Sequence, residues 1–249
     1  MSCTNRYDVS LVCVYNKADL LEEMRRSAES SGLSIECIFL DNMDSSYSCA
    51  ADALNEGVGL ATAPVIVTLH QDVEFLEPSS LVDLVRLVSE GALGLYGIVG
   101  VDSLCRDRAI MSRIREGEDG SRVYSSLVED IAEVATLDEC LVAFRRELRD
   151  VVRFDSSVCP GWHLYAVDLC LQARRLDIPS FAVGIPSWHK SRGVDASFRA
   201  SCELLARKYR RDFSQIATTC AWFPTGFVLY PLYRFYSFSK RMLIGRGIH

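Results

Sequence analysis

The chain has 249 residues, 49% of them hydrophobic and 24% charged, a composition typical of a globular protein with one large α/β domain or two small ones. Its formal net charge of −6 argues against nucleic acid as a partner, because a phosphate-binding surface needs an excess of Lys and Arg. No basic flank with an apolar stretch opens the chain, and no uncharged apolar run approaches about 18 residues. We therefore expect neither a signal peptide nor a transmembrane helix.

The ten cysteines are scattered and lack the spacing of a structural zinc site. Four of them lie within apolar runs and are expected to be reduced core residues of a cytoplasmic protein. These are Cys13, Cys37, Cys140 and Cys170.

The first part of the chain alternates apolar runs with helical patterns. Strands are expected over 8–14, 34–40 and 65–69, and helices from residue 17 to about 28, over 48–61 and over 78–89. This order predicts a mostly parallel sheet with helices on both faces.

Beyond Gly91 the pattern changes. A charged, weakly periodic stretch over 103–133 predicts a lid or binding loop. Around it we expect strands over 96–101, 141–145 and 181–185, and helices over 162–175 and 196–209.

Polar side chains follow each of the first three strands, at the edge of a parallel sheet where ligands bind. They are Tyr15-Asn16, Asp41-Asn42 and His70-Gln71-Asp72. An aromatic residue with Asp and Asn could hold a base and a ribose, while the third group holds phosphates through a metal. Loop capping is the alternative for Asp41, because Asp and Asn favour turns.

Two histidines, His70 and His189, also stand where a strand ends. Asp72 with His189 would offer an oxygen and a nitrogen ligand to Mn²⁺, or to Mg²⁺ with nucleotide phosphates completing the shell. His163 is either a core residue or part of the site. Asp168, in an apolar helical pattern, is either a hydrogen-bonded structural acid or a base with a raised pKa.

Several common motifs are missing. There is no GxGxxG after the first strand, no Walker loop and no GxSxG elbow. A metal-dependent nucleotidyltransferase would show a Gly-rich, basic loop after the first strand, where this chain has Tyr15-Asn16-Lys17-Ala18-Asp19.

One ordered set of segments is specific when taken together. It comprises residues 12–16, 55–57, 61, 69–73, 97–101, 137–139, 143–147, 154–155, 161–170 and 188–191. The order and spacing of these segments resemble those of the family 2 glycosyltransferases of GT-A fold. The resemblance is closest to their glycosyltransferase-like branch, in which the metal motif is His-Gln-Asp instead of Asp-x-Asp. The resemblance runs from about Val9 to Gly193.

The resemblance implies roles for individual residues. The donor nucleotide would be bound by Tyr15, Asn16, Asp41, Asn42, Asn55, His70 and Gln71, and the metal by Asp72 and His189. Tyr165-Ala166-Val167-Asp168 keeps only the last acid of the commoner Glu-Asp-x-Asp, so either Asp168 or His163 would be the catalytic base. Asp138 and Trp162 would lie near the acceptor.

The implied activity is transfer of a sugar from a nucleotide-diphosphate sugar (UDP-, dTDP- or GDP-linked) to a hydroxyl acceptor. The resemblance implies an inverting, Mn²⁺- or Mg²⁺-dependent enzyme of polysaccharide or glycoconjugate assembly, acting on a saccharide or lipid-linked acceptor. The alternative is a non-catalytic sugar-nucleotide binder on the same fold.

The last part of the chain, 213–249, has a different character. It is rich in aromatic residues and in Lys and Arg, with no acid after Asp212. We expect a catalytic domain over 1–212 and a tail that either contacts the inner face of an anionic membrane or packs as a helix on the domain or in a homodimer interface.

Overall fold

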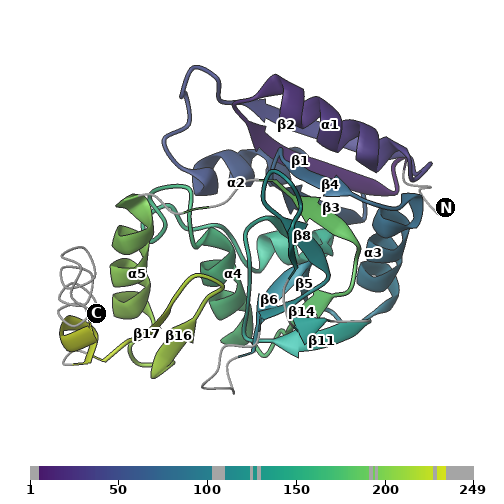
Figure 1. Cartoon of the computed structure of the whole chain (residues 1–249). Helices are drawn as coiled ribbons and strands as arrows, with labels where there is room; N and C mark the ends of the chain where they lie inside the picture. Colours follow the sequence, from purple (N-terminus) through teal and green to yellow (C-terminus); the bar gives the residue numbers. More distant parts are fainter. Residues whose placement is uncertain are drawn as a thin grey trace.

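The computed structural model describes residues 6–102, 110–123, 126–127, 130–190, 193, 196–226 and 229–233. Within these residues, a seven-stranded sheet runs through the centre in the order β11-β14-β5-β13-β3-β1-β2 (Figure 1). Its strands are β1 (Val9–Tyr15), β2 (Ile35–Asp41), β3 (Val65–Leu69), β5 (Leu95–Gly97), β11 (Ile131–Val134), β13 (Leu141–Arg145) and β14 (Ser180–Val183).

The sheet is mostly parallel, as the sequence predicts. β1 pairs in parallel with both β2 and β3, and β14 pairs in parallel with β5. Two strands run against the others: β13, between β3 and β5, and the edge strand β11. The reversed β13 matters for the site, because the residues before it lie at the same edge as the residues after β3.

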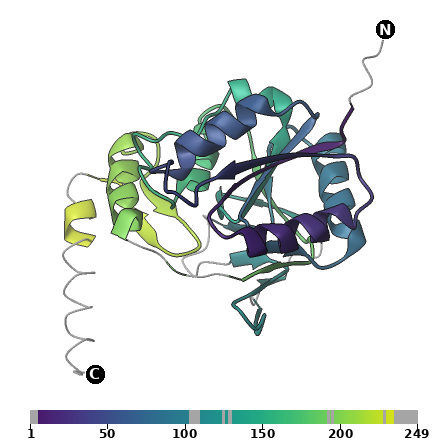
Figure 2. The same ribbon diagram turned by 90° about the horizontal axis from the view of Figure 1, so that it is seen from above.

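Helices cover both faces of the sheet, and the alternation of side chains along each strand explains how (Figure 2). In β1, Leu11 and Cys13 join the core beneath α1 (Ala18–Glu29) and α3 (Pro78–Glu90). Val12 points the other way, into the core shared with α2 (Ala50–Leu60) and α4 (Tyr165–Arg174). Leu205 and Ala206 of α5 (Ala196–Lys208) extend that second core.

Three smaller sheets surround the main one. One has the order β4-β15-β8-β9, a second β10-β7-β6-β12, and the third is the hairpin β16-β17. Their bounds are β4 (Val73–Phe75), β6 (Val99–Val101), β7 (Ile110–Ser112), β8 (Ile114–Glu116), β9 (Arg122–Val123), β10 (Ser126–Leu127), β12 (Thr136–Leu137), β15 (Ser187–His189), β16 (Gln215–Ala217) and β17 (Trp222–Pro224), and a 3₁₀ helix spans Arg146–Asp150.

The stretch over 103–133, predicted as a lid or binding loop, contains short strands where the structure describes it. Three other local expectations were wrong. The strand expected over 96–101 is two strands, β5 and β6, in different sheets. Helix α4 begins at Tyr165 rather than at 162, because Leu164 takes a left-handed φ of 67°. Cys37 is exposed on β2, the edge strand, whereas Cys13, Cys140 and Cys170 are buried as expected.

Part of the tail packs against the main body. The side chains of Ile216 and Phe223 in the β16-β17 hairpin are at most 1% exposed and belong to the same core as α4 and α5. The hydroxyl of Thr136 donates to the carbonyl oxygen of Ala217 at 2.7 Å. Residues 234–249, which carry the basic residues of the membrane prediction, lie outside the described residues.

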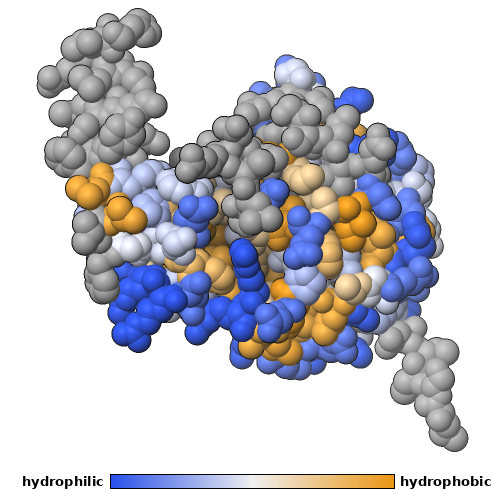
Figure 3. Space-filling view, turned by 90° about the horizontal axis from the view of Figure 1, so that it is seen from below, coloured by the Kyte–Doolittle hydropathy of each residue, from blue (hydrophilic) through white to orange (hydrophobic). Residues whose placement is uncertain are grey.

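The surface shows hydrophobic patches separated by hydrophilic side chains on the face drawn in Figure 3. Exposed large apolar residues occur on several elements, including Leu229 and Leu232 after the hairpin. Among the residues that the structure describes, no helix combines the length and the apolar character needed to cross a bilayer.

Candidate functional site

The ends of β1, β2 and β3 meet at one edge of the sheet, which confirms the expected arrangement. Tyr15 is the register partner of Asp41 in the parallel pair, and β3 lies on the other side of β1. A cavity of about 1180 Å³ opens at this edge. Of the predicted site residues, its lining includes Tyr15, Asn16, Asn42, His70, Gln71, Asp72, Asp138, Trp162, His163 and His189.

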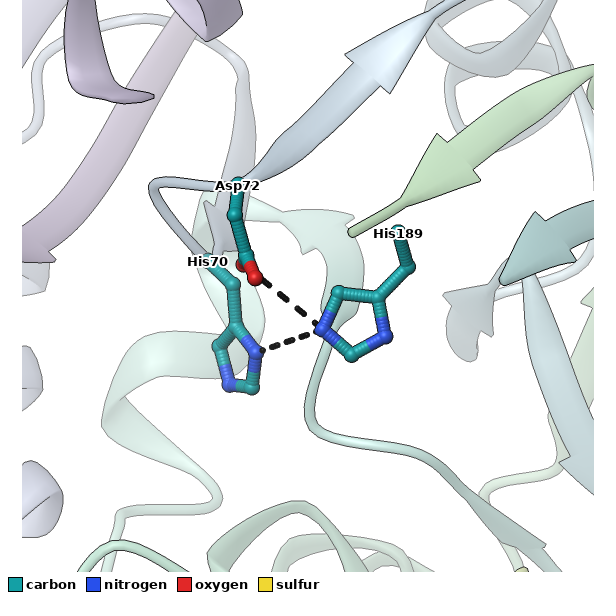
Figure 4. A group of neighbouring side chains, drawn as sticks. All are labelled: His70, Asp72 and His189. Atoms are coloured by element: carbon teal, nitrogen blue, oxygen red, sulfur yellow. Dashed lines mark hydrogen bonds and ion pairs between the residues drawn. The ribbon is translucent and has the colours of Figure 1, made fainter. Parts of the chain in front are cut away.

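His70, Asp72 and His189 converge at this cavity (Figure 4). Nε2 of His189 lies 3.3 Å from Nδ1 of His70 and 3.6 Å from Oδ1 of Asp72. Strand pairing brings them together, because β15 runs antiparallel to β4 with His189 opposite Val73. The main-chain N–H of Lys190 also donates to the carbonyl oxygen of Asp72 at 3.1 Å.

These three side chains could hold a divalent metal. One ligand atom from each lies within 4.8 Å of the others, and two imidazole nitrogens with one carboxylate oxygen suit a transition-metal ion such as Mn²⁺. His70, which the sequence assigned to the donor nucleotide, therefore also offers a ligand atom to this cluster. Burial and the neighbouring His189 lower the pKa of His70 to about 4, which keeps the imidazole neutral, the form that binds metals.

Gln71 connects two strand ends. Its Oε1 accepts hydrogen bonds from the main-chain N–H groups of Asn16 and Lys17, at 2.9 and 2.8 Å, and its Nε2 donates to Oδ1 of Asn16 at 2.8 Å. Helix α1 has no side-chain cap from its own N-cap residue, Lys17. Gln71 thus satisfies backbone groups at the start of α1 and fixes the loop after β1.

The other predicted nucleotide-binding residues differ in position. Asn42 lines the cavity, and its Oδ1 accepts the N–H of Tyr47 at 2.8 Å. Asp41 is not among the lining residues; its Oδ1 accepts the N–H of Met43 at 2.8 Å, which is the turn-capping role. Burial and a hydrogen bond with Asp41 raise the pKa of the Tyr15 phenol.

Asn55 lies on α2 away from the cavity lining. Its amide pairs in both directions with the backbone of Phe154: Nδ2 donates to the carbonyl oxygen at 2.8 Å, and Oδ1 accepts the N–H at 3.2 Å. Asn55 therefore fastens α2 to the segment that leads into α4.

Two acids and a histidine from other segments also line the cavity. Asp138 and Glu139 precede the reversed strand β13, and the N–H of His70 donates to the carbonyl oxygen of Cys140 at 2.9 Å. Oε1 of Glu139 lies 3.5 Å from Nδ1 of His163 and accepts the N–H of Leu164 at 3.2 Å. Burial raises the pKa of Glu139.

Glu139 was missed as a site residue. Its signal was an acid directly before a buried strand, next to Asp138, but only the antiparallel direction of β13 places that position at the ligand edge. The left-handed Leu164 turns the chain before α4, so that both Trp162 and His163 line the cavity.

Asp168 is fully buried on α4 and is not among the residues that line the cavity. Nζ of Lys208 lies 2.8 Å from its Oδ1, which also accepts a hydrogen bond from the hydroxyl of Tyr209 at 2.7 Å. Nε2 of Gln172 donates to its Oδ2 at 2.7 Å. Of the two alternatives for Asp168, a hydrogen-bonded structural acid or a base with a raised pKa, these partners favour the structural acid.

A comparison with known protein families matches residues 10–215 to the family described as "Glycosyltransferase like family". The chain belongs to this glycosyltransferase-like family. The fold points the same way, because solved structures of GT-A glycosyltransferases superpose on this family member with TM-scores just above one half.

Three of these structures illustrate the likeness. The mannosyltransferase PcManGT from Pyrobaculum calidifontis, in complex with GDP-Man and Mn²⁺, has a TM-score of 0.53 and 16% identity over 84% of this chain and 66% of its own. TarS 1–349 from S. aureus, in complex with UDP-GlcNAc, has a TM-score of 0.55 and 13% identity over 82% of this chain and 67% of its own. GalNAc-T7, with UDP, GalNAc and Mn²⁺, has a TM-score of 0.52 and 11% identity over 82% of this chain and 48% of its own. At these identities the likeness shows the GT-A fold.

Among curated proteins, "ATP synthase subunits region ORF 6" of Fuscovulum blasticum is 38% identical over 81 residues. The match spans 32% of this glycosyltransferase-like chain and 31% of the relative, so about a third of each.

Proposed function

We propose that the chain transfers a sugar, with inversion and with the help of a divalent metal, from a nucleotide-diphosphate sugar to a hydroxyl acceptor. The convergence of His70, Asp72 and His189 at the carboxyl edge of the sheet carries this proposal. In open α/β sheets this edge is the usual ligand site, and two imidazoles and a carboxylate there offer three ligand atoms to a metal.

The chemistry of the ligands favours Mn²⁺ over Mg²⁺, because Mg²⁺ prefers an all-oxygen shell and here two of the three ligands are nitrogens. A metal held here would offset the charge that develops on the departing nucleoside diphosphate. The presence of Mn²⁺ in the structures of PcManGT and GalNAc-T7 supports the same choice.

The donor nucleotide would lie along the ends of β1 and β2, where Tyr15 and Asn42 line the cavity. The cavity volume of about 1180 Å³ exceeds the range of about 300–1,000 Å³ usual for one drug-sized ligand, so it leaves space for an acceptor beside the donor.

His163 is the better candidate for the base. It lines the cavity, and Glu139 lies close enough to orient its ring and to stabilise the imidazolium that forms when it takes a proton from the acceptor hydroxyl. The acceptor oxygen would then attack the anomeric carbon on the face opposite the leaving diphosphate, which inverts the configuration. Asp168 would act by holding α4 to α5 through Lys208.

The experiment is a screen of UDP-, GDP- and dTDP-sugars for Mn²⁺-dependent rises in melting temperature, followed by assays of transfer and donor hydrolysis with each hit. Asp72→Ala is expected to abolish both the metal-dependent rise and the turnover. Glu77→Ala, an acid removed from an exposed position outside the cavity, is the control. Full transfer by a folded Asp72→Ala protein would refute the proposal. Donor binding without turnover would favour the non-catalytic binder.

We also infer that the tail contacts an anionic membrane, which would suit a lipid-linked acceptor. Leu229 and Leu232 are about 60% exposed just before the basic, aromatic residues of 234–249. Sedimentation of the full chain with anionic and with neutral liposomes at low salt tests this, and equal, negligible binding to both would exclude it.

The other role considered for the tail is a homodimer interface. Light scattering at several protein concentrations tests whether the chain forms a dimer.

A further inference from the structure

The turn between β16 and β17 reaches the cavity although it lies outside the family match, which ends at residue 215. Thr219 and Cys220, in this turn, are among the lining residues. The strands on either side anchor the turn, since Phe223 is fully buried and Ala217 accepts a hydrogen bond from Thr136.

The turn is fixed internally by Thr218. Its hydroxyl accepts the N–H of Ala221 at 2.8 Å and the N–H of Cys220 at 3.2 Å, and it lies 2.9 Å from the carbonyl oxygen of Ala221. A turn held in this way presents its remaining side chains in a set direction before any ligand arrives.

Thr219 holds Asp138. Its hydroxyl donates to Oδ2 of Asp138 at 2.6 Å, while Oδ1 accepts the N–H of Cys140 at 3.0 Å. These two bonds fix the orientation of the carboxylate. Asp138 itself lines the cavity, so its carboxylate can face a ligand.

We propose that the turn over 218–221 is the acceptor side of the cavity and that Thr219 is a positioning residue, orienting Asp138 to accept hydrogen bonds from hydroxyl groups of a saccharide acceptor. This rests on the proposed function. Asp138 is not part of the His70–Asp72–His189 cluster. A carboxylate that acts without a metal is unsuited to a donor diphosphate, because like charges repel, and well suited to a neutral polyol. Asp138 also stands on the His163 side of the cavity, where the acceptor hydroxyl has to be.

The first test compares Thr219→Val, which removes the hydroxyl at almost constant volume, with Thr219→Ser, which keeps it. The acceptors are methyl hexosides, tested with whichever donor raises the melting temperature. We expect Thr219→Val to raise the acceptor KM about tenfold, with the donor-dependent rise in melting temperature unchanged, and Thr219→Ser to stay near the parent value. The inference would be overturned if Thr219→Val weakened donor binding as much as acceptor binding, or if Thr219→Ser raised the acceptor KM as much as Thr219→Val.

The second test does not depend on turnover. With Cys3, Cys37 and Cys105 replaced by Ser, Cys220 is the exposed cysteine among those the structure describes, and its alkylation by N-ethylmaleimide can be followed by mass spectrometry. Saturating methyl hexoside should slow alkylation at least severalfold. A matched protein that keeps Cys37 on β2 and lacks Cys220 should show no protection.

If no methyl hexoside slows alkylation of Cys220, the inference fails, whatever the donors do. The melting-temperature screen with donors and Mn²⁺ reports separately on the proposed function, so the two failures are distinguishable.

Discussion

The phenol oxygen of Tyr165 lies 2.9 Å from Nε2 of His70, on the side of the ring away from the metal cluster. Nδ1 of His70 faces His189, so a metal at the cluster requires the proton of the neutral imidazole to be on Nε2. Nε2–H then donates to Tyr165, whose own hydroxyl lies 3.4 Å from the carbonyl oxygen of Glu139. A residue of α4 thereby fixes the tautomer of a residue after β3.

Tyr165→Phe should therefore weaken metal binding without removing a ligand. The ring is 4% exposed and would stay packed, but His70 would lose the partner that orients it. We expect the Kd for Mn²⁺ to rise about 10- to 100-fold, as measured by titration calorimetry. An unchanged Kd would show that the hydrogen bond has no part in metal binding.

Glu139→Gln should lower the rate of transfer while leaving donor affinity intact, because it keeps the shape of the side chain and removes the charge beside His163. General acid–base catalysis contributes about 10²–10⁴-fold, which sets the scale of the loss. The readout is kcat at saturating donor, with the donor Kd as control. A fall in donor affinity equal to the fall in kcat would assign Glu139 to the donor instead.

The same variant should alter the pH profile. Burial raises the pKa of Glu139, so the carboxylate that supports His163 forms only above the usual glutamate range. Transfer should increase as the pH rises through that pKa, and this limb should be missing in Glu139→Gln. A profile identical to that of the parent would contradict the assigned role.

Lys208→Met should destabilise the fold because it leaves Asp168 buried without its cation. Breaking a buried pair typically costs about 3–5 kcal/mol, whereas replacing both partners costs less. Urea unfolding should show a large loss for Lys208→Met and a partial recovery for Lys208→Met with Asp168→Asn. If instead Asp168→Asn kept full stability and lost all transfer, Asp168 would be the base.

Glu36 predicts a pH-dependent contribution to stability. Its carboxylate accepts hydrogen bonds from the Ser10 hydroxyl and from both the N–H and the hydroxyl of Thr62, and these bonds outweigh partial burial and lower its pKa. The contribution is complete above the ordinary glutamate pKa and disappears as the pH falls through the lowered value. Glu36→Gln should cost about 1 kcal/mol at neutral pH and progressively less in acid. Glu77→Gln, at an exposed position, should show neither effect.

Hydrophobic patterning was enough to predict that the polar residues after the first three strands lie at one edge of the sheet. The apolar runs that precede Tyr15, Asp41 and His70 form parallel strands, and parallel strands bring their carboxyl ends to one edge. His189 was also predicted near Asp72, although the strand pairing of β15 with β4 that brings them together was not.

The remaining parts depend on contacts between distant segments that no local pattern records. The partner of Asp168, Lys208, stands 40 residues later on another helix. Glu139 reaches the cavity only because β13 runs against β3. Asn55, a polar residue in an apolar helix, satisfies the backbone of Phe154, 99 residues away. Asp168 and Asn55 were recognisable as unusual in the sequence and Glu139 was not, but in each case the partner decided the role.

The reversed strand β13 has a mechanical consequence. A continuous ladder of register pairs, from Leu141↔Leu69 to Arg145↔Val65, ties it to β3. The segment with Asp138 and Glu139 and the segment with His70 and Asp72 therefore leave one stiff backbone frame and cannot separate without breaking main-chain hydrogen bonds. His189 and Thr219 come from two other sheets, but hydrogen bonds join them to this frame: Lys190 N–H donates to Asp72, and the Thr219 hydroxyl donates to Asp138. If the cavity changes shape as substrates enter and leave, the strand ends that carry Asp138, Glu139, His70 and Asp72 will stay in place.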